Sequence, residues 1–322
     1  MLTLTLRKRR HQINEMNQFR ADYVKTLLDE IPKPRNQVAA ISGLSNPYIS
    51  ELERGSFTKV GREKLISLAV ALDLNLKETE ELLGVFQGSK LTTNDIPTYL
   101  EITERGRLSS ALYPVRNAIS QLLLFALVEK LPGDLIIVAD RPTATLRAEG
   151  HTSYIHRDIA ETDTIYDALV EAIFRKRRQY LLQRLEKYRC QQYICKEILD
   201  DYVSKCDDSA EKDWRIRHIE NLLWLTKNYA NFIPYLTRVS ANFAFTLNLT
   251  ANIEKETDKL LFVAKQLQFI REATSGRLTG FATDNQMVIQ NFKKEIEFIK
   301  TTVIEEYLDR RNLETYLGSL IP

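Results

Sequence analysis

Short helical segments separated by proline and glycine dominate the first 86 residues of the chain. Phe19, Tyr23, Leu27 and Ile31 recur every four residues and so line one face of a helix that begins near residue 16. Proline and glycine break the later segments, because proline cannot continue a helix and glycine adopts the left-handed backbone of a helix end. Five such segments within about 70 residues predict a compact all-helical domain over residues 16–88.

Periodicities typical of both helices and strands follow in the remainder of the chain. Leu135–Val138 is a short apolar run typical of a buried strand, and apolar side chains alternate with small or polar ones from Val239 to Leu249. Residues 278–283 predict a second strand beside that one, and helices are expected over 114–131, 165–185, 213–226 and 288–303. We therefore expect an α+β protein, with a linker at 89–113 and a mixed α/β effector or dimerisation domain at 114–322.

The first 15 residues predict an N-terminal arm. Leu2, Leu4 and Leu6 alternate with Thr3 and Thr5, which predicts a short strand over residues 2–6. A basic run follows immediately, at Arg7, Lys8, Arg9 and Arg10. Such a run is equally compatible with a solvated tail and with an arm that reaches DNA.

Charge is distributed unevenly between the two parts of the chain. The 45 Lys and Arg residues stand against 43 Asp and Glu, so the formal net charge is only +2. Residues 1–90 hold 14 basic and 11 acidic side chains, a balance of +3, which leaves −1 for the remainder. This balance excludes a protein that coats DNA indiscriminately, but it suits binding through a few phosphate contacts.

The expected location follows from three features of the sequence. The longest apolar run, Leu122–Val128, is far shorter than the roughly 20 residues of a membrane helix. The basic run comes after the first apolar residues, whereas a secretory signal places its charges first. Three cysteines are too few for a disulfide framework. We expect a cytoplasmic protein that does not insert into a membrane.

The segment Arg35–Gly55, RNQVAAISGLSNPYISELERG, carries the strongest functional signal. The small side chain of Ala39 would let two helices cross closely, and Gly43 permits a sharp turn between them. Ile49 and Leu52 would bury one face of the second helix. The opposite face of that helix would remain available to a partner.

These residues resemble the helix-turn-helix of the XRE family, the Cro and phage-repressor type. The resemblance covers about a quarter of the chain, because the flanking helices from residue 16 to about 86 also fit the five-helix domain of that family. It implies a sequence-specific transcription regulator whose second motif helix enters the major groove of DNA. The matching positions are Ala39, Gly43, Ser45, Ile49, Ser50, Leu52, Glu53 and Gly55.

The resemblance also assigns individual residues to DNA. Asn46, Pro47, Ser50 and Glu51 would face base edges, where asparagine pairs with adenine and glutamate accepts from cytosine. Asn46 and Pro47 would also be the N-cap and first residue of that helix. Pro47 stands where many members carry a polar residue, so part of the readout is expected to depend on DNA shape. Contacts to the DNA backbone are expected from Arg35, Ser45, Tyr48, Arg54, Lys59 and Arg62.

The expected partners are double-stranded DNA and a second copy of the chain, because one helix-turn-helix reads only a short half-site. Candidate dimer elements are the strand at 2–6 and the apolar helix at 114–131, for which hydrophobic core is the simpler explanation. The C-terminal domain would sense a small molecule or bind a protein effector. Two alternatives remain open: an antitoxin-like or defence-system component whose C-terminal region binds a protein, and an enzyme tethered to DNA.

The remaining reactive side chains do not form a recognisable catalytic or metal site. Cys190, Cys195 and Cys206 lack the CxxC spacing of a zinc site, and the first two are expected to be partly buried thiols. His151 and His156 have no third ligand nearby. No phosphate-binding loop or nucleophile motif is present, so we expect no cofactor, no metal and no enzymatic activity.

A second basic run, Arg175–Arg178, lies on a predicted helix. A solvated helix face is its simplest interpretation. A second nucleic-acid surface or a pocket for an anionic ligand is the alternative.

The end of the chain resembles, more faintly, a phospholipase-D-like sensor module of bacterial and archaeal regulators. Gly280, Thr283, Asp284 and Asn285 precede a long amphipathic helix after a pair of strands. The related enzymes carry a His-x-Lys motif, and no histidine of this chain is followed two residues later by lysine. The resemblance therefore implies a sensor role without catalysis.

Overall fold

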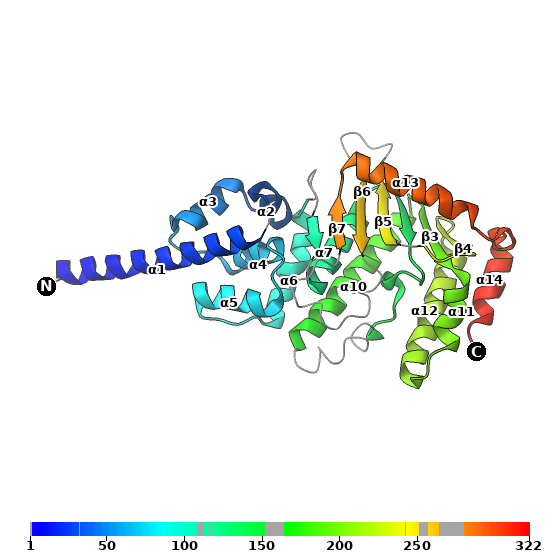
Figure 1. Cartoon of the computed structure of the whole chain (residues 1–322). Helices are drawn as coiled ribbons and strands as arrows, with labels where there is room; N and C mark the ends of the chain where they lie inside the picture. The colour runs from blue at the N-terminus through cyan, green and yellow to red at the C-terminus, as the bar shows by residue number, and fades with distance from the viewer. Residues whose placement is uncertain are drawn as a thin grey trace. The chain divides into compact units, whose positions relative to one another are not determined.

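The computed structural model describes residues 2–31, 33–107, 113–115, 117–151, 164–241, 243–250, 257–263 and 280–322. The chain divides into two compact units, residues 1–109 and residues 110–322 (Figure 1). The first unit is helical in its described part, and the second contains helices and one β-sheet. The protein is therefore a mixed helical and stranded one, as the sequence predicts.

Helices form the first unit, and they include the five that the sequence predicts. The observed bounds are α1 (Leu2–Glu30), α2 (Arg35–Ser42), α3 (Asn46–Arg54), α4 (Arg62–Ala71) and α5 (Leu76–Gln87), followed by the 3₁₀ turn η1 (Thr93–Asp95) and α6 (Ile96–Arg105).

The predicted strand at residues 2–6 is wrong, because these residues form the beginning of α1. The Leu-Thr alternation is only five residues long, and good helix formers follow it directly, so the long helix extends back through it. The predicted arm at 1–15 is consequently part of a helix rather than a separate segment. The side chains of Arg7, Lys8, Arg9 and Arg10 lie outside the described residues.

The predicted linker at 89–113 is also wrong over much of its length. Thr92 and Asp95 form a capping box, in which each side chain binds the other residue's backbone N–H. Pro97 occupies the first turn of α6, where its missing N–H costs nothing. Tyr99 and Ile102 are buried, and α6 packs on α2 and α4. The first unit is therefore larger than the five predicted helices.

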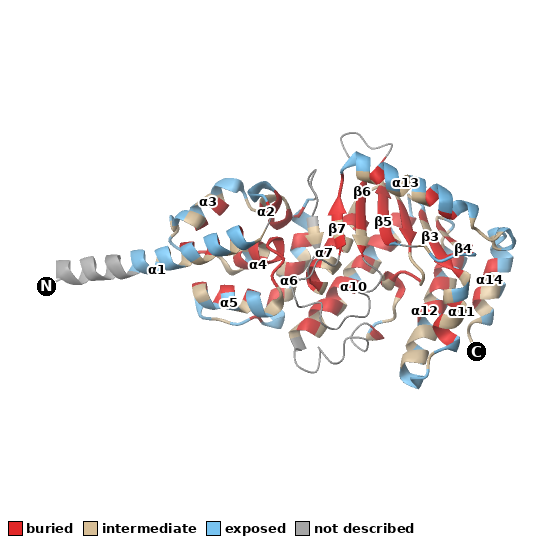
Figure 2. Ribbon diagram, viewed as in Figure 1, coloured by how far each residue is buried: buried red, intermediate tan, exposed pale blue. Residues whose placement is uncertain are grey.

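Buried residues of the helices gather toward the centre of the first unit (Figure 2). Ile49, Leu52, Leu65, Leu68 and Leu82 are fully buried. Full burial of one such side chain contributes about 1.5–3 kcal/mol. This shared core fixes α3 against α1 and α2, so the outward face of α3 is held rigidly.

A seven-stranded sheet organises the second unit, in the order β1-β7-β6-β5-β2-β3-β4. Strands β2, β3 and β4 are parallel, and the other neighbouring pairs are antiparallel. The strands are β1 (Tyr113–Val115), β2 (Asp134–Val138), β3 (Cys190–Cys195), β4 (Phe232–Thr237), β5 (Ala244–Leu249), β6 (Lys259–Val263) and β7 (Gly280–Thr283).

The two strongest strand predictions are confirmed in part. Strand β2 coincides with the apolar run at 135–138, and β5 occupies the second half of the alternating segment at 239–249. Strand β7 forms within 278–283, but it pairs with β6 and β1 rather than with β5. Strand β6 separates them and was not predicted.

Helices lie against both faces of this sheet (Figure 1). The predicted helix at 114–131 begins only at Ala118, since Pro114 is in β1 and Asn117 caps the helix through its side chain. Its apolar side chains are buried within the unit, which is the hydrophobic-core use that the sequence allowed. The helices are α7 (Ala118–Lys130), η2 (Ala144–Leu146), α10 (Thr164–Leu185), α11 (Lys196–Ser204), α12 (Ser209–Asn228), α13 (Gln286–Thr301), η4 (Glu305–Leu308) and α14 (Arg310–Ser319).

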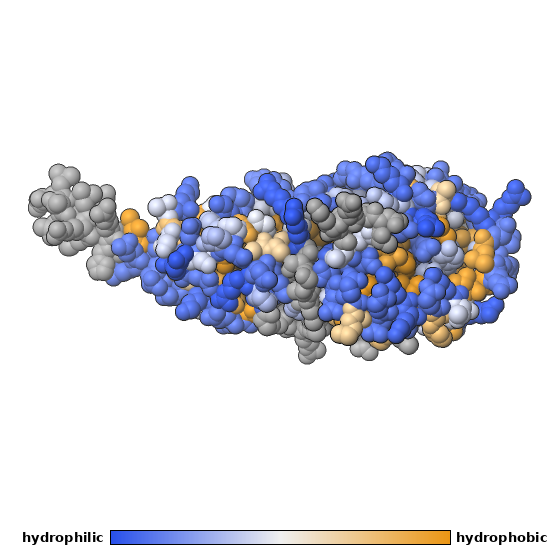
Figure 3. All heavy atoms as spheres, turned by 90° about the horizontal axis from the view of Figure 1, so that it is seen from above, coloured by the Kyte–Doolittle hydropathy of each residue, from blue (hydrophilic) through white to orange (hydrophobic). Residues whose placement is uncertain are grey.

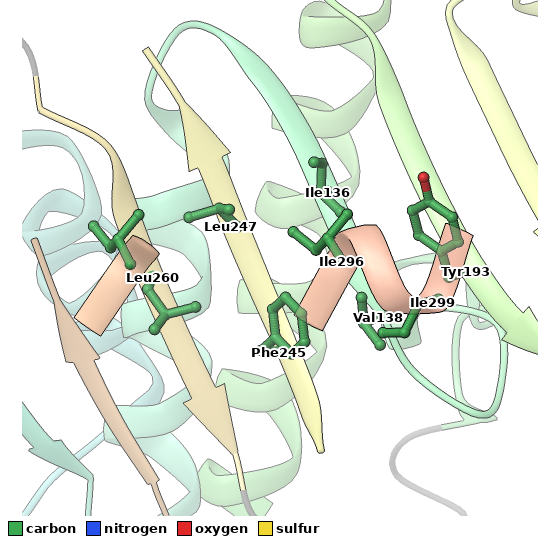
Figure 4. Packing of buried hydrophobic residues seen from close by; sticks show 9 residues of the cluster. Ile136, Val138, Tyr193, Phe245, Leu247, Leu260, Ile296 and Ile299 are labelled. Carbon is green, nitrogen blue, oxygen red and sulfur yellow. The ribbon is translucent and has the colours of Figure 1, made fainter. Parts of the chain in front are cut away.

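The best-defined core of the second unit lies between α13 and the sheet. Ile296 and Ile299 of α13 point onto Ile136, Val138 and neighbouring strand residues (Figure 4). Ile136 and Val138 share a face because side chains alternate along a strand. The face of the molecule drawn in Figure 3 is mainly hydrophilic. Among the described helices, none combines the length and apolar character that a bilayer crossing needs.

Candidate nucleic-acid interface

Local interactions at both ends set the limits of α3. The Ser45 hydroxyl accepts a hydrogen bond from the Tyr48 backbone N–H (3.3 Å), so Ser45 is the N-cap and Pro47 lies in the first turn. The predicted N-cap, Asn46, is thus the first helical residue. At the other end Gly55 has φ +69°, and a Cβ there would meet the Asn17 carbonyl oxygen at 3.2 Å. Glycine at this position therefore permits both the turn and the close approach of α1.

The turn between α2 and α3 depends on Gly43. Its φ of +68° is a left-handed conformation that side-chain-bearing residues rarely adopt. The Ser42 hydroxyl donates to the Val38 carbonyl oxygen (2.6 Å) and accepts from the Leu44 N–H (3.2 Å), which closes the turn. The predicted glycine turn is confirmed.

Helix α3 has a buried face and an open face. Ile49 and Leu52 are fully buried, as predicted. Asn46, Pro47 and Glu51 are exposed, and Ser50 is half-buried. The four residues expected to face bases therefore lie on the surface of the first unit, and none of them supplies a large apolar side chain to its core.

Three cations belong to α3 or to the residues that follow it up to the start of α4. Arg54 and Lys59 are exposed and make no ion pair with any residue in the described part of the chain. The Lys64 ammonium on α4 lies 4.2 Å from the centre of the Tyr48 ring, where the ring face attracts a cation. Burial, Glu63 and Glu51 raise the pKa of Tyr48, so its hydroxyl remains a hydrogen-bond donor at neutral pH. The sequence did not identify Lys64, because its proximity to Tyr48 depends on the packing of α4.

Arg35 is oriented by acidic side chains of its own unit. Its guanidinium donates to Glu53 (2.7 Å) and to Asp29 (3.1 Å), and these hydrogen bonds raise its pKa. The Arg35 side chain remains 42% exposed. It can therefore face a phosphate, but Glu53 and Asp29 compete for its donors.

Arg62 is held by groups of its own unit. It begins α4 and donates to both Asp95 oxygens (2.6 and 2.8 Å), to the Ser89 hydroxyl (2.6 Å) and to the Lys90 carbonyl oxygen (2.5 Å). Asp95 is buried. Arg62 therefore joins α4 to η1, and its donors are already used there; its contact with DNA stays a prediction.

The second basic run turns mostly inward, so a solvated helix face is wrong for two of its four members. Arg177 is 2% exposed and forms a bidentate ion pair with Glu129, with both N···O distances at 2.7 Å. Arg178 donates to the Thr145 carbonyl oxygen and to that of Arg147. Arg175 is exposed, as predicted.

The cysteines show no sign of reactivity. Cys190 and Cys195 are buried at the two ends of β3, and Cys206 is half-buried. Burial raises the pKa of the Cys190 thiol to about 12, so the thiol is protonated at neutral pH. His151 is buried, and His156 lies outside the described residues. The described residues contain no group of three or more potential metal ligands.

The residues that suggested a sensor module have structural roles in the second unit. A Cβ at Gly280 would collide with the Phe262 carbonyl oxygen on β6. Asp284 forms a buried ion pair with Lys259 (2.7 Å), and Asn285 caps α13 through its side chain. These contacts join β6, β7 and α13.

The chain was also compared with known proteins. No family model, curated protein or solved structure matches it.

Proposed function

We propose that this chain is a sequence-specific DNA-binding transcription regulator whose recognition helix is α3. The observation that carries the proposal is the division of α3 into a fully buried face and an open polar face, which carries Arg54 and has Lys64 against Tyr48. A helix fixed in this way can enter the major groove, which admits an α-helix and displays a distinct pattern of donors and acceptors for each base pair.

The open face supplies the side-chain types that such readout uses. The Asn46 amide both donates and accepts, and this combination matches adenine. The Glu51 carboxylate accepts from the cytosine amino group and repels phosphate, so it favours one position and disfavours others. Arg54, Lys59 and Lys64 supply positive charge for the DNA backbone.

A regulator of this kind requires two recognition helices, one from each copy of the chain. One helix contacts only a short half-site, so we propose that the protein acts as a homodimer on a pseudo-palindromic operator. The α/β unit would then carry dimerisation or the response to an effector.

Genomic footprinting with the full chain tests the proposal, because it yields the operator sequence and the spacing of the half-sites. Mobility-shift assays on that operator then compare three variants. Asn46→Ala and Glu51→Ala should each cost about 1–3 kcal/mol and relax the base preference at one position. Lys59→Ala should weaken binding to all sequences alike and reduce the salt dependence by about one counterion.

The exposed Lys77 on α5 provides a matched control, since it makes no ion pair with a described residue and lies outside the proposed face. Lys77→Ala should bind the operator like the wild type. If Asn46→Ala and Glu51→Ala both bind as tightly and as selectively as the wild type, α3 is not the recognition helix.

A further inference from the structure

A group of arginines in the second unit surrounds the buried Tyr202 side chain of α11. Arg141 and Arg147 stand on either side of η2, and Arg215 belongs to α12. The Arg215 and Arg141 guanidiniums lie over the Tyr202 ring, at 5.0 and 5.4 Å from its centre. We call Arg141, Arg147 and Arg215 the cationic cluster. Two segments of the chain, the one around η2 and α12, supply its members.

The Tyr202 hydroxyl does not offset the positive charge of these arginines, because its hydrogen bond goes to His218. The Nε2 atom of His218 lies 2.9 Å from the Thr143 carbonyl oxygen, which can only accept, so Nε2 carries the proton. Burial and Arg147 keep the pKa of His218 well below its usual value, so His218 is neutral and its Nδ1 accepts from the Tyr202 hydroxyl (3.0 Å). The Tyr202 hydroxyl proton is thereby already used.

Carboxylates of the described residues do not pair with every arginine of the cationic cluster. Glu211 accepts hydrogen bonds from Arg215 and forms an ion pair with it. The negative charge of Asp140 favours the charged form of Arg141. Arg147, by contrast, donates no side-chain hydrogen bond to a described residue, and its Nε atom is buried without a partner. Arg147 is half-buried, and a cation that loses part of its water without gaining a counter-charge is unfavourable. Among the described residues, Arg147 therefore has no carboxylate partner, whereas Arg215 has Glu211.

A second orphaned group lies next to Arg147. His151 is 1% exposed, stacks on the Trp214 ring with 5.8 Å between ring centres, and has no partner for its Nδ1 atom. Burial, Arg147 and Arg215 lower the pKa of His151 to about 3, so this nitrogen belongs to a neutral ring at pH 7. Two unused polar atoms thus lie at the same place in the fold.

We propose that the cationic cluster binds a phosphoryl oxyanion, with Arg147 as its principal ligand. One guanidinium satisfies a planar carboxylate bidentately, whereas several guanidiniums from different directions suit the tetrahedral oxygens of a phosphate group. Inorganic phosphate and a small phosphate monoester share this chemistry. The inference concerns the second unit and does not depend on DNA binding.

Tryptophan fluorescence can report on this site directly. The two tryptophans of the chain, Trp214 and Trp224, are both in α12. Trp224 is 50% exposed, so Trp224→Phe in the full chain leaves Trp214, beside His151, as the single reporter. Titration of this protein with inorganic phosphate or glycerol 3-phosphate, at constant ionic strength, should give a saturable change. The tighter of the two identifies whether the free ion or an ester is preferred.

The decisive variant is Arg147→Met, which keeps the length of the side chain and removes its charge. It should weaken the phosphate response about 10- to 100-fold. Without phosphate it should unfold at the same temperature as the wild type or higher, because a half-buried cation without a described counter-charge is gone. Arg175→Met is the matched control, since Arg175 is exposed and its ion pair with Glu149 is long, at 3.7 Å. It should titrate like the wild type.

Phosphate at about one hundred times its wild-type Kd should also raise the Tm of the wild-type second unit by roughly 5–10 °C and raise that of Arg147→Met by about half of that or less. Four outcomes would overturn the proposal. They are the absence of any saturable response, equal responses of Arg147→Met and the wild type, a phosphate-free Tm of Arg147→Met below that of the wild type, and succinate binding as tightly as phosphate.

Discussion

The ion pair between Arg62 and Asp95 yields a prediction that separates folding from DNA binding. Arg62→Ala removes four hydrogen bonds and leaves the Asp95 carboxylate, only 7% exposed, without its cation. The Asp95 carboxylate would then keep only its hydrogen bonds from the Thr92 N–H (2.7 Å) and hydroxyl (3.2 Å). Burial by itself raises the pKa of Asp95, and Arg62 and Thr92 together outweigh burial and lower it.

The expected loss of stability follows from the exposure of the two partners. Breaking a fully buried pair from one side costs about 3–5 kcal/mol, and Arg62 is 27% exposed, so we expect about 2–4 kcal/mol. For a unit of this size the loss lowers Tm by roughly 10–20 °C. It is a large part of the roughly 5–15 kcal/mol that holds a typical domain together.

Two spectroscopic signals in one denaturant titration measure this effect. Circular dichroism at 222 nm follows the helices of both units, whereas tryptophan fluorescence follows the second unit alone, because both tryptophans are in α12. Arg62→Ala should shift an early part of the dichroism transition to lower denaturant and leave the fluorescence transition in place. Arg105→Ala is the control: its pair with Glu101 is exposed, so we expect a change of about 0–1 kcal/mol.

A different result would assign Arg62 to DNA binding instead of folding. If Arg62→Ala unfolds at the wild-type midpoint but binds DNA more weakly, Arg62 contacts phosphate and its structural role is wrong. A double-mutant cycle with Asp95→Asn adds a second test. A coupling energy near zero between the two positions would also refute the reasoning.

Two further predictions concern backbone strain and pH. Gly43→Ala should lower the stability of the first unit by about 1–2 kcal/mol, seen as a lower dichroism midpoint; the new Cβ would lie 3.5 Å from the Arg105 Cβ, an ordinary contact, so the cost is the strain at φ +68°. The second unit should lose stability as the pH falls below about 6.5, because His151 and His218 take up protons more readily when unfolded. The slope should approach about 1.4 kcal/mol per pH unit for each histidine, extending toward pH 3 for His151. Fluorescence-monitored denaturation at pH 7.5 and pH 5 measures this slope, which His151→Gln should reduce and which a flat profile would contradict.

Periodicity and turn residues were sufficient to predict most helices of the first unit. Each of these helices has an apolar stripe and a stop signal, such as Gly43 or Gly55, whose backbone conformation hardly any other residue adopts. Helix α6 was missed because its start signals, the capping box at Thr92 and Asp95 and the proline in its first turn, were overlooked. The start of α1 was missed because a five-residue alternation fits a strand only when a partner strand exists.

In the second unit, sequence reasoning found the strands with a single strong pattern and missed the weaker one. Strands β2 and β5 are clear in the sequence, and β6 is not, because periodicity alone cannot tell its short apolar run, Leu260–Val263, from a buried helix segment; the charged Lys259 begins the strand. Lys259 is buried all the same, since Asp284 lies 25 positions later in the chain and pairs with it. No local pattern contains that information.

The same limitation explains why the ion-pair partners of the basic residues could not be predicted. Arg62 meets Asp95 across 33 positions, and Arg177 meets Glu129 across 48, so neither pair is visible as a charge pattern on one helix. A basic run therefore indicates function only after the structure shows which cations already have counter-charges. Among the described residues, Lys59 near α3 and Arg147 in the cationic cluster have none, and their positions differ in a way that decides what each can bind. Lys59 is exposed and keeps its hydration, which suits a contact with a phosphate on a large polyanion at little cost in desolvation. Arg147 has already lost water at its Nε atom, which suits a small anion held in place by several guanidiniums.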